Sequence, residues 1–186
     1  MTEGALVFAS LIVGIALTDQ LSSLHRLLRD RTAVRWSVRA LWTALLIFLT
    51  QVQVWWAVAD GKAERLTIGQ FLPTLAVLTF LFLAAAASLP DKGRAEDRDL
   101  ERFYDSERRY IWAMLVFALG FALLGNALER LHDRESLSTM AERAIGDGIV
   151  LALMASNIWV RSPRWHYVTL AVLSLGPIQW LSRGLG

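Results

Sequence analysis

Asp19 is the ionisable residue best placed to do chemistry in this chain, because it follows an apolar run without charge over residues 4–18. An ionised carboxylate inside a membrane costs roughly 2.5–3.5 kcal/mol, so it must face the protein interior, line a watery cavity or pair with a base. Ser22 and His25 follow at helical spacing and extend this polar patch. The patch fits an ion ligand or a proton acceptor, and equally a carboxylate that only caps or pairs near the headgroups.

Other polar residues interrupt the remaining apolar runs and fall into two groups. If the runs are helices that converge, the inner group is Asp19, His25, Asn157 and His166, and the outer group is Gln51, Gln53, Asn126, Glu129, Asp147 and Gln179. Two polar vestibules separated by an apolar middle suit a channel or an alternating-access carrier. They equally suit a packed bundle whose polar residues stay within reach of water.

Enzyme and metal chemistry find little support in the sequence. There is no cysteine, which excludes disulfides, thiolate metal sites and cysteine nucleophiles. A transmembrane haem needs two facing histidines, so only His25 with His166 qualifies, and no metal-ligand spacing accompanies them. Asp147 follows Gly146, but no Tyr-Asp pair lies in an apolar run to complete an intramembrane aspartyl protease. We therefore expect no catalytic residues, no metal and no cofactor.

The elements that must position these residues are membrane-spanning helices. The chain has 186 residues, is 55% hydrophobic and only 19% charged, and its charges are concentrated between long uncharged runs. About 20 apolar residues cross a bilayer. The runs predict an all-α membrane protein with six transmembrane helices, near residues 5–27, 38–59, 67–89, 107–131, 143–160 and 165–182.

Three short patterns occur twice in the same order and indicate a duplicated three-helix unit. Residues 18–25 resemble 125–132, residues 53–55 resemble 157–159, and residues 74–79 resemble 169–174. Because each unit holds an odd number of spans, the two units would be inverted, a common construction in transporters. The predicted organisation is a first repeat over 1–90, a cytoplasmic connection over 91–109 and a second repeat over 110–186.

The basic residues predict the orientation. Thirteen of the 19 lysines and arginines lie in the first, third and fifth connections, which should therefore be cytoplasmic, with both termini outside. Tryptophans, Trp112 among them, fall near the predicted interfaces, where such rings are common. The N-terminus carries Glu3 and no basic residue, which argues against a cleaved signal peptide. We expect a multi-pass protein of the bacterial inner membrane that contacts lipid and binds no nucleic acid.

The third connection contains an amphipathic stretch over residues 96–110. Leu100, Phe103, Tyr104 and Ile111 recur at helical spacing among charges. We expect the fourth helix to begin here, as a solvated extension at the lipid surface. The alternative is a docking or gating element for a cytoplasmic protein partner.

Small residues repeat every four positions in two of the predicted helices. The ridges are Ser10, Gly14, Thr18 and Ser22 in the first helix, and Ala144, Gly148, Ala152 and Ser156 in the fifth. Such ridges let two helix backbones approach closely in lipid. They predict packing interfaces within one chain or between chains, and a homo-oligomer suits so thin a bundle.

The sequence favours a small channel or transporter for an ion or a small polar solute. Asp19 and Asn126 would be pseudo-equivalent lining residues, assisted by Asp147 and the Gln51/Gln53 pair. The alternative is an accessory, sensor or scaffold module that binds a partner through the 96–110 helix.

Overall fold

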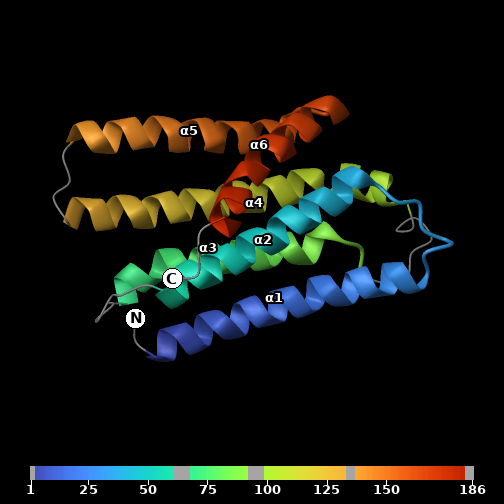
Figure 1. The fold of residues 1–186 in the computed structure, drawn as a ribbon, viewed down its shortest axis with the longest axis horizontal. Helices are drawn as coiled ribbons and strands as arrows, with labels where there is room; N and C mark the ends of the chain where they lie inside the picture. Colours follow the sequence, from blue (N-terminus) through green and yellow to red (C-terminus); the bar gives the residue numbers. More distant parts are fainter. Residues whose placement is uncertain (1–2, 61–67, 92–98, 133–136, 183–186) are drawn as a thin grey trace.

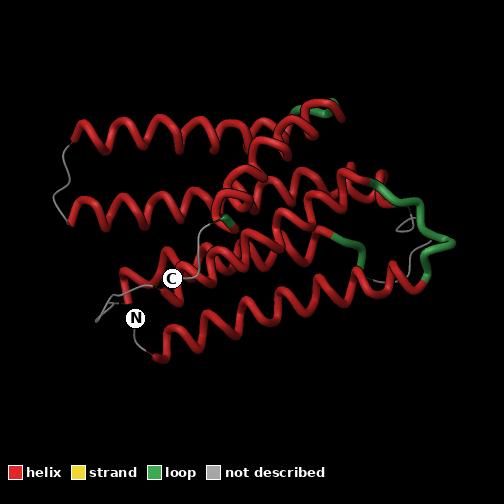
Figure 2. The backbone as a smooth tube through the Cα atoms, in the orientation of Figure 1, coloured by secondary structure: helices red, strands yellow, loops and turns green. Residues whose placement is uncertain are grey.

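The computed structural model describes residues 3–60, 68–91, 99–132 and 137–182, and these residues form an all-helical bundle (Figures 1 and 2). The helices are α1 Glu3–Arg29, α2 Val38–Asp60, α3 Ile68–Ser88, α4 Leu100–His132, α5 Leu137–Trp159 and α6 Pro163–Leu181. These ranges contain no β-strand, only an isolated bridge between Arg35 and Asp99. Six helices were expected, and their order and approximate positions are confirmed.

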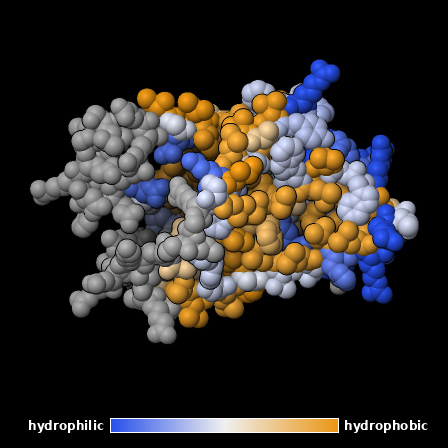
Figure 3. Space-filling view, viewed as in Figure 1, coloured by the Kyte–Doolittle hydropathy of each residue, from blue (hydrophilic) through white to orange (hydrophobic). Residues whose placement is uncertain are grey.

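Four of these helices are long and apolar enough to cross a membrane, and they are α1 to α4. In α5 the apolar part, Ala144–Trp159, is shorter. Figure 3 shows apolar side chains over the middle of the visible face, and hydrophilic ones at the end where the α1–α2 and α5–α6 connections lie. An apolar belt with a charged end is the surface that a bilayer requires, so the chain is a helical membrane protein.

The helices run back and forth, and their contacts differ between the two halves of the chain. In the first half, α1, α2 and α3 all pack on one another. In the second half, α4 packs on α5 and α5 on α6, but α6 lies mainly against α2 and makes no close backbone contact with α4 among the described residues. Figure 1 shows α6 crossing the other helices obliquely. The broadest helix contact joins the halves through α3 and α4.

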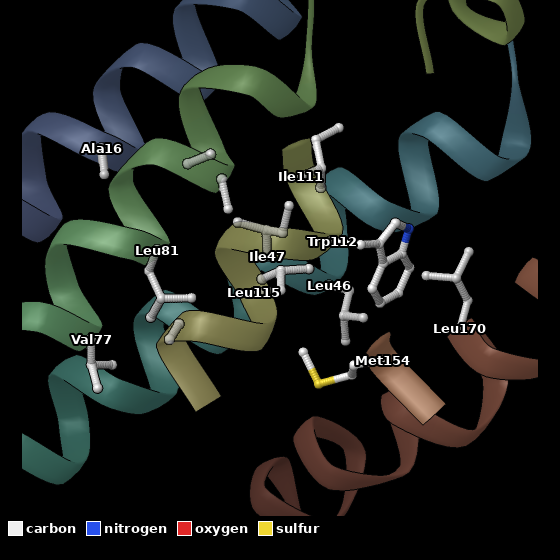
Figure 4. Packing of buried hydrophobic residues seen from close by; sticks show 13 residues of the cluster. Ala16, Leu46, Ile47, Val77, Leu81, Ile111, Trp112, Leu115, Met154 and Leu170 are labelled. Atoms are coloured by element: carbon white, nitrogen blue, oxygen red, sulfur yellow. The ribbon is translucent and has the colours of Figure 1, made fainter. Parts of the chain in front are cut away.

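The main apolar core lies where α2, α3 and α4 meet. Trp112 and Ile47 are completely buried there, and Figure 4 shows the Trp112 indole between Leu46 and Leu170. On the other side of α4, a Cβ built on Gly125 would come within 3.3 Å of the Pro73 Cβ, so a small residue suits this approach of α3 and α4. Trp112 therefore anchors the core, and its ring is enclosed by protein. Its level near the membrane boundary stays a prediction.

The start of α4 also differs from the expectation of a solvated helix at the lipid surface. The helix is continuous from Leu100, and its first turns are packed into the bundle, with Leu100, Tyr104 and Arg108 all buried. The stretch is an amphipathic helix as predicted, but its apolar face packs on α1 and α2 rather than on lipid. This packing brings charged residues of α4 against the other helices, where they build the candidate site.

Candidate functional site

The expected polar patch on α1 is only partly directed into the protein. Asp19 is half-buried and forms no ion pair among the described residues, whereas Ser22 and His25 are exposed. Successive residues of a helix are rotated by about 100° and so face different sides. Here the side chain that points inward is the neighbouring Gln20. Its Nε2 donates to the Ala44 carbonyl at 2.8 Å and to the Ser88 hydroxyl at 3.0 Å.

The predicted outer cluster is not assembled by the fold. Gln51 is buried, Gln53 and Asp147 are half-buried, and Asn126 and Gln179 are exposed on different helices. The Glu129 side chain lies outside the described part of the protein. The chain therefore brings one member, Gln51, into the interior and leaves Asn126 and Gln179 on the surface.

Three buried amide groups have atoms without hydrogen-bond partners among the described residues. Both side-chain polar atoms of Gln51 are in this state, as are Gln20 Oε1 and Asn157 Oδ1. Gln51 and Asn157 were predicted from the sequence, whereas Gln20 was missed beside the charged Asp19. A buried amide without a partner costs free energy, so each of these groups is a place where water or a polar ligand can be stabilised.

The inner cluster is replaced by a larger polar network at the charged end of the bundle. Asn157 and His166 belong to it, but Asp19 and His25 do not. Its central cation is Arg108 of α4, whose Nη1 donates to the carbonyls of Asn157 at 3.0 Å and Val160 at 3.0 Å. These carbonyls end α5, where a helix leaves acceptors unsatisfied and carries partial negative charge. Arg108 therefore closes the end of α5.

His166 is held by hydrogen bonds at both ring nitrogens. Its Nε2 lies 2.9 Å from the Val160 carbonyl, which can only accept, so Nε2 carries the hydrogen. In the neutral ring, Nδ1 then accepts from the Tyr104 hydroxyl at 2.8 Å. The Trp112 indole donates to the same hydroxyl oxygen at 2.9 Å. These hydrogen bonds tie α4 to α6 and to the end of α5, and the His166 side chain is completely buried.

The first residues of α2 attach to α4 through charge. The Arg39 guanidinium is buried, pairs with Glu101 and Asp105, and lies 5.3 Å from the centre of the Tyr104 ring. Ser37 donates to Glu101 as well. The two carboxylates and the aromatic face offset much of the cost of burying this charge, although Arg39 Nη1 has no partner among the described residues. The network thus fixes the angle between α2 and α4.

Asp99 begins α4 as its N-cap. Its Oδ1 accepts from the backbone N–H groups of Glu101 and Arg102, both at 3.1 Å, and its Oδ2 lies 3.2 Å from Arg35 Nη1. The backbone N–H of Arg102, with help from the Arg35 guanidinium, holds the pKa of this carboxyl below its usual value. The ionised form is therefore the one that the folded protein stabilises.

The network does not resemble a metal or haem site. His25 is exposed, and both nitrogens of His166 are occupied, so these two residues do not form an axial pair. Among the described residues, no group of three or more histidines and carboxylates is placed to hold a metal ion. What the network can do is hold four helices together at the charged end of the bundle.

The small-residue ridges face outward. Ser10 accepts a hydrogen bond from the Trp55 indole, but Gly14, Thr18 and Ser22 are exposed. In α5, Ser156 accepts from Trp165, and the rest of the ridge, Ala144, Gly148 and Ala152, is exposed. A Cβ on Gly14 or Gly148 would meet no atom within 4 Å. The ridges therefore do not pack within the chain over most of their length.

An apolar groove lies between α4 and α5, with a volume of about 250 Å³. It is lined by Val116, Phe117, Gly120, Phe121, Leu124 and Leu151. None of these residues was a candidate from the sequence, because their types are those of any membrane helix. Only the packing of α4 against α5 shows that they leave a groove.

No protein-family model, curated protein or solved structure matches this chain. The fold and the site therefore define the class, a multi-helix membrane protein.

Proposed function

We propose that this membrane protein is a small channel or transporter for an ion or a small polar solute. The observation that supports this best is Gln51, which is 1% exposed and has no hydrogen-bond partner for either side-chain polar atom among the described residues. Gln51 lies in α2, one turn from the fully buried Ile47 of the apolar core. Its burial supports the role of a pore-lining residue that the sequence suggests.

The unsatisfied Gln51 amide supports transport because such a group is costly inside a bilayer. Inside a membrane, each unsatisfied polar group costs several kcal/mol, because lipid offers no hydrogen bonds. Water, an ion or a polar solute that enters the bundle would supply the missing partners. Gln20 and Asn157 add unpartnered amide oxygens on α1 and α5, which are acceptors of the same kind elsewhere in the bundle. In this proposal, the two inverted repeats and six spans predicted from the sequence frame the path.

Flux through liposomes tests the proposal. We expect Gln51→Leu to lose most ion, proton or polar-solute flux and to fold at least as stably as the wild type, because it removes an unsatisfied buried amide. Gln53→Leu is the matched control, since Gln53 is two residues away and only half-buried. It should retain flux. Asp19→Ala should lose flux if the half-buried carboxylate lines the same path.

Two results would count against transport. One is a tight liposome with correctly folded wild-type protein, assayed with several ions and solutes. The other is a Gln51→Leu variant that gains stability and keeps its full flux, which would make Gln51 a structural residue alone.

A second candidate is an accessory or scaffold module, favoured by the outer face of the first turns of α4. Arg102, Asp105, Ser106 and Arg109 are exposed there, although the opposite face is buried. Reversing this surface with Arg102→Glu and Ser106→Arg should leave flux intact in a transporter. In a scaffold, the same change should abolish copurification of the cytoplasmic partner.

We also propose that the protein is a homo-oligomer in a bacterial inner membrane, with the arginine-rich connections in the cytoplasm. Outward-facing Gly14 and Gly148 support close packing between copies. The mass of the detergent-solubilised protein tests the oligomer, and a monomer at all concentrations would oppose it.

A further inference from the structure

The arginines at the charged end of the bundle fall into two groups with different surroundings. On the side of α1, α2 and the start of α4, Arg26, Arg35, Arg39 and Arg102 each lie within 4 Å of a carboxylate, whereas the exposed Arg29 and Arg31 form no ion pair within the described residues. At the junction of α4, α5 and α6, the exposed Arg109, Arg161 and Arg164 form no ion pair within the described residues. Positive charge therefore accumulates at this junction.

Arg109 and Arg161 both lie near Arg108 at this junction, and Arg164 follows Arg161 by three residues in the α5–α6 connection. Arg108 contacts the Val160 carbonyl, next to Arg161 in the chain. Arg109 and Arg161 both repel the positive charge of Arg108 electrostatically, and the Asp105 carboxylate partly offsets them. Trp159 is 70% exposed and Trp165 is 38% exposed beside this patch. Arginines with flanking tryptophans are the usual composition of a protein surface at the level of lipid headgroups.

The α4–α5 groove begins below this patch on the same side of α4. Arg109, Val116, Gly120 and Leu124 are spaced by seven, four and four residues, which keeps them on one helical face. At 1.5 Å per residue, Val116 lies about 10 Å and Leu124 about 22 Å along the helix from Arg109. One leaflet of hydrocarbon is about 15 Å thick. The groove thus lies at the deeper part of this leaflet and around the bilayer midplane, where the end of an acyl chain lies when its headgroup is at Arg109.

We propose that this junction and groove together form a binding site for one anionic phospholipid. The headgroup phosphate contacts Arg109, Arg161 and Arg164, and one acyl chain occupies the groove between α4 and α5. Charge complementarity selects an anionic lipid over a zwitterionic one, because the patch has no carboxylate of its own within ion-pair distance. Basic pockets between transmembrane helices on the cytoplasmic side bind anionic headgroups in this way.

The experiment is native mass spectrometry of the full-length protein in detergent, titrated with phosphatidylglycerol or with phosphatidylcholine of the same acyl chains. The wild type should retain phosphatidylglycerol preferentially. Arg161→Gln combined with Arg164→Gln should bind it roughly 30-fold more weakly, which is about 1 kcal/mol for each arginine near an anionic lipid. The control is Arg29→Gln with Arg31→Gln, which removes the same charge from exposed arginines at the α1–α2 connection.

A second variant tests the groove independently of charge. A Cβ on Gly120 meets no atom within 4 Å, so Gly120→Leu fills the groove without forcing the backbone to move. It should displace the lipid, whereas Gly176→Leu, at an equally open glycine of α6, should not. Equal retention of the two lipids by the wild type, or loss in the Arg29/Arg31 control as large as in the Arg161/Arg164 variant, would overturn the proposal. So would full retention by Gly120→Leu.

Discussion

The Tyr104 hydroxyl oxygen is the point where the polar network is most concentrated. It accepts from Trp112 and contacts His166 Nδ1, and the His166 ring in turn donates to the end of α5. All three side chains are essentially inaccessible to solvent. Removing one partner from such a buried chain leaves the others unsatisfied, which costs more than the hydrogen bond contributes.

Tyr104→Phe should therefore destabilise the protein by about 1–3 kcal/mol, because Trp112 and His166 both lose a buried partner. Unfolding in mixed detergent micelles would measure this difference. Tyr110→Phe is the control, because Tyr110 is 43% exposed and makes no described side-chain hydrogen bond. Equal stability of the two variants would show that water replaces the hydroxyl at Tyr104.

The sequence predicts only some of the polar side chains that are buried. Gln51 and Asn157 were chosen because they are polar residues in apolar runs, and both are buried. On α1, charge directed the choice to Asp19, but the rotation of the helix buries Gln20 instead. That rotation is set by packing against Ala44 and Ser88, far away in the sequence. The partners of Tyr104 could not be predicted either, because His166 is also far away in the sequence.

Whole helices were predicted more accurately than their surroundings. Apolar runs bounded by charge predicted all six helices, since helical hydrogen bonding is the local solution for an apolar chain in lipid. The position of α6 against α2 depends on side-chain fit, including the hydrogen bond from the Trp42 indole to Ser174. The cap at the start of α4 likewise depends on Arg35, which belongs to a distant connection.

The N-cap at Asp99 predicts a pH dependence for α4. The folded protein lowers the pKa of this carboxyl, so its stabilising effect is complete above the ordinary aspartate pKa of about 3.9. The effect is lost as the pH falls through the lower folded value. At pH 7, Asp99→Asn should melt at a lower temperature than the wild type, because the amide can still cap but no longer pairs with Arg35.

Melting temperatures of both proteins from pH 7 to pH 3 provide the measurement. The gap between them should narrow as the pH falls below 4, when the wild-type carboxyl also becomes neutral. Other carboxylates shift both curves together, so the difference isolates Asp99. A gap that stays constant over this range would mean that charge at the cap contributes nothing.

At the scale of the molecule, the two halves share sequence patterns but not packing. The pattern pairs Asp19 with Asn126 and Trp55 with Trp159. Yet Asp19 is half-buried and Asn126 exposed, and Trp55 bonds Ser10 while Trp159 is 70% exposed. In one copy of the chain, equivalent positions therefore have different surroundings.

The number and direction of the spans can be tested directly, because a chain without cysteine accepts single cysteines as reporters. Six spans place Ala59 and Ser182 outside the cell, and Arg31 and Ser162 in the cytoplasm. Labelling of single-cysteine variants with a membrane-impermeant maleimide in spheroplasts should then modify the first pair at once. The second pair should react only after permeabilisation, because thirteen of the 19 basic residues favour that side.

The decisive comparison is between Ser162 and Ser182, at the two ends of α6. If only the four long apolar helices cross the membrane, Ser162 and Ser182 react from the same side while Arg31 and Ala59 stay on opposite sides. That outcome would contradict the predicted inverted repeat, because the second half would then contain one span and the first half three. Opposite labelling of Ser162 and Ser182 would instead give each half three spans, which is the odd number that inversion requires.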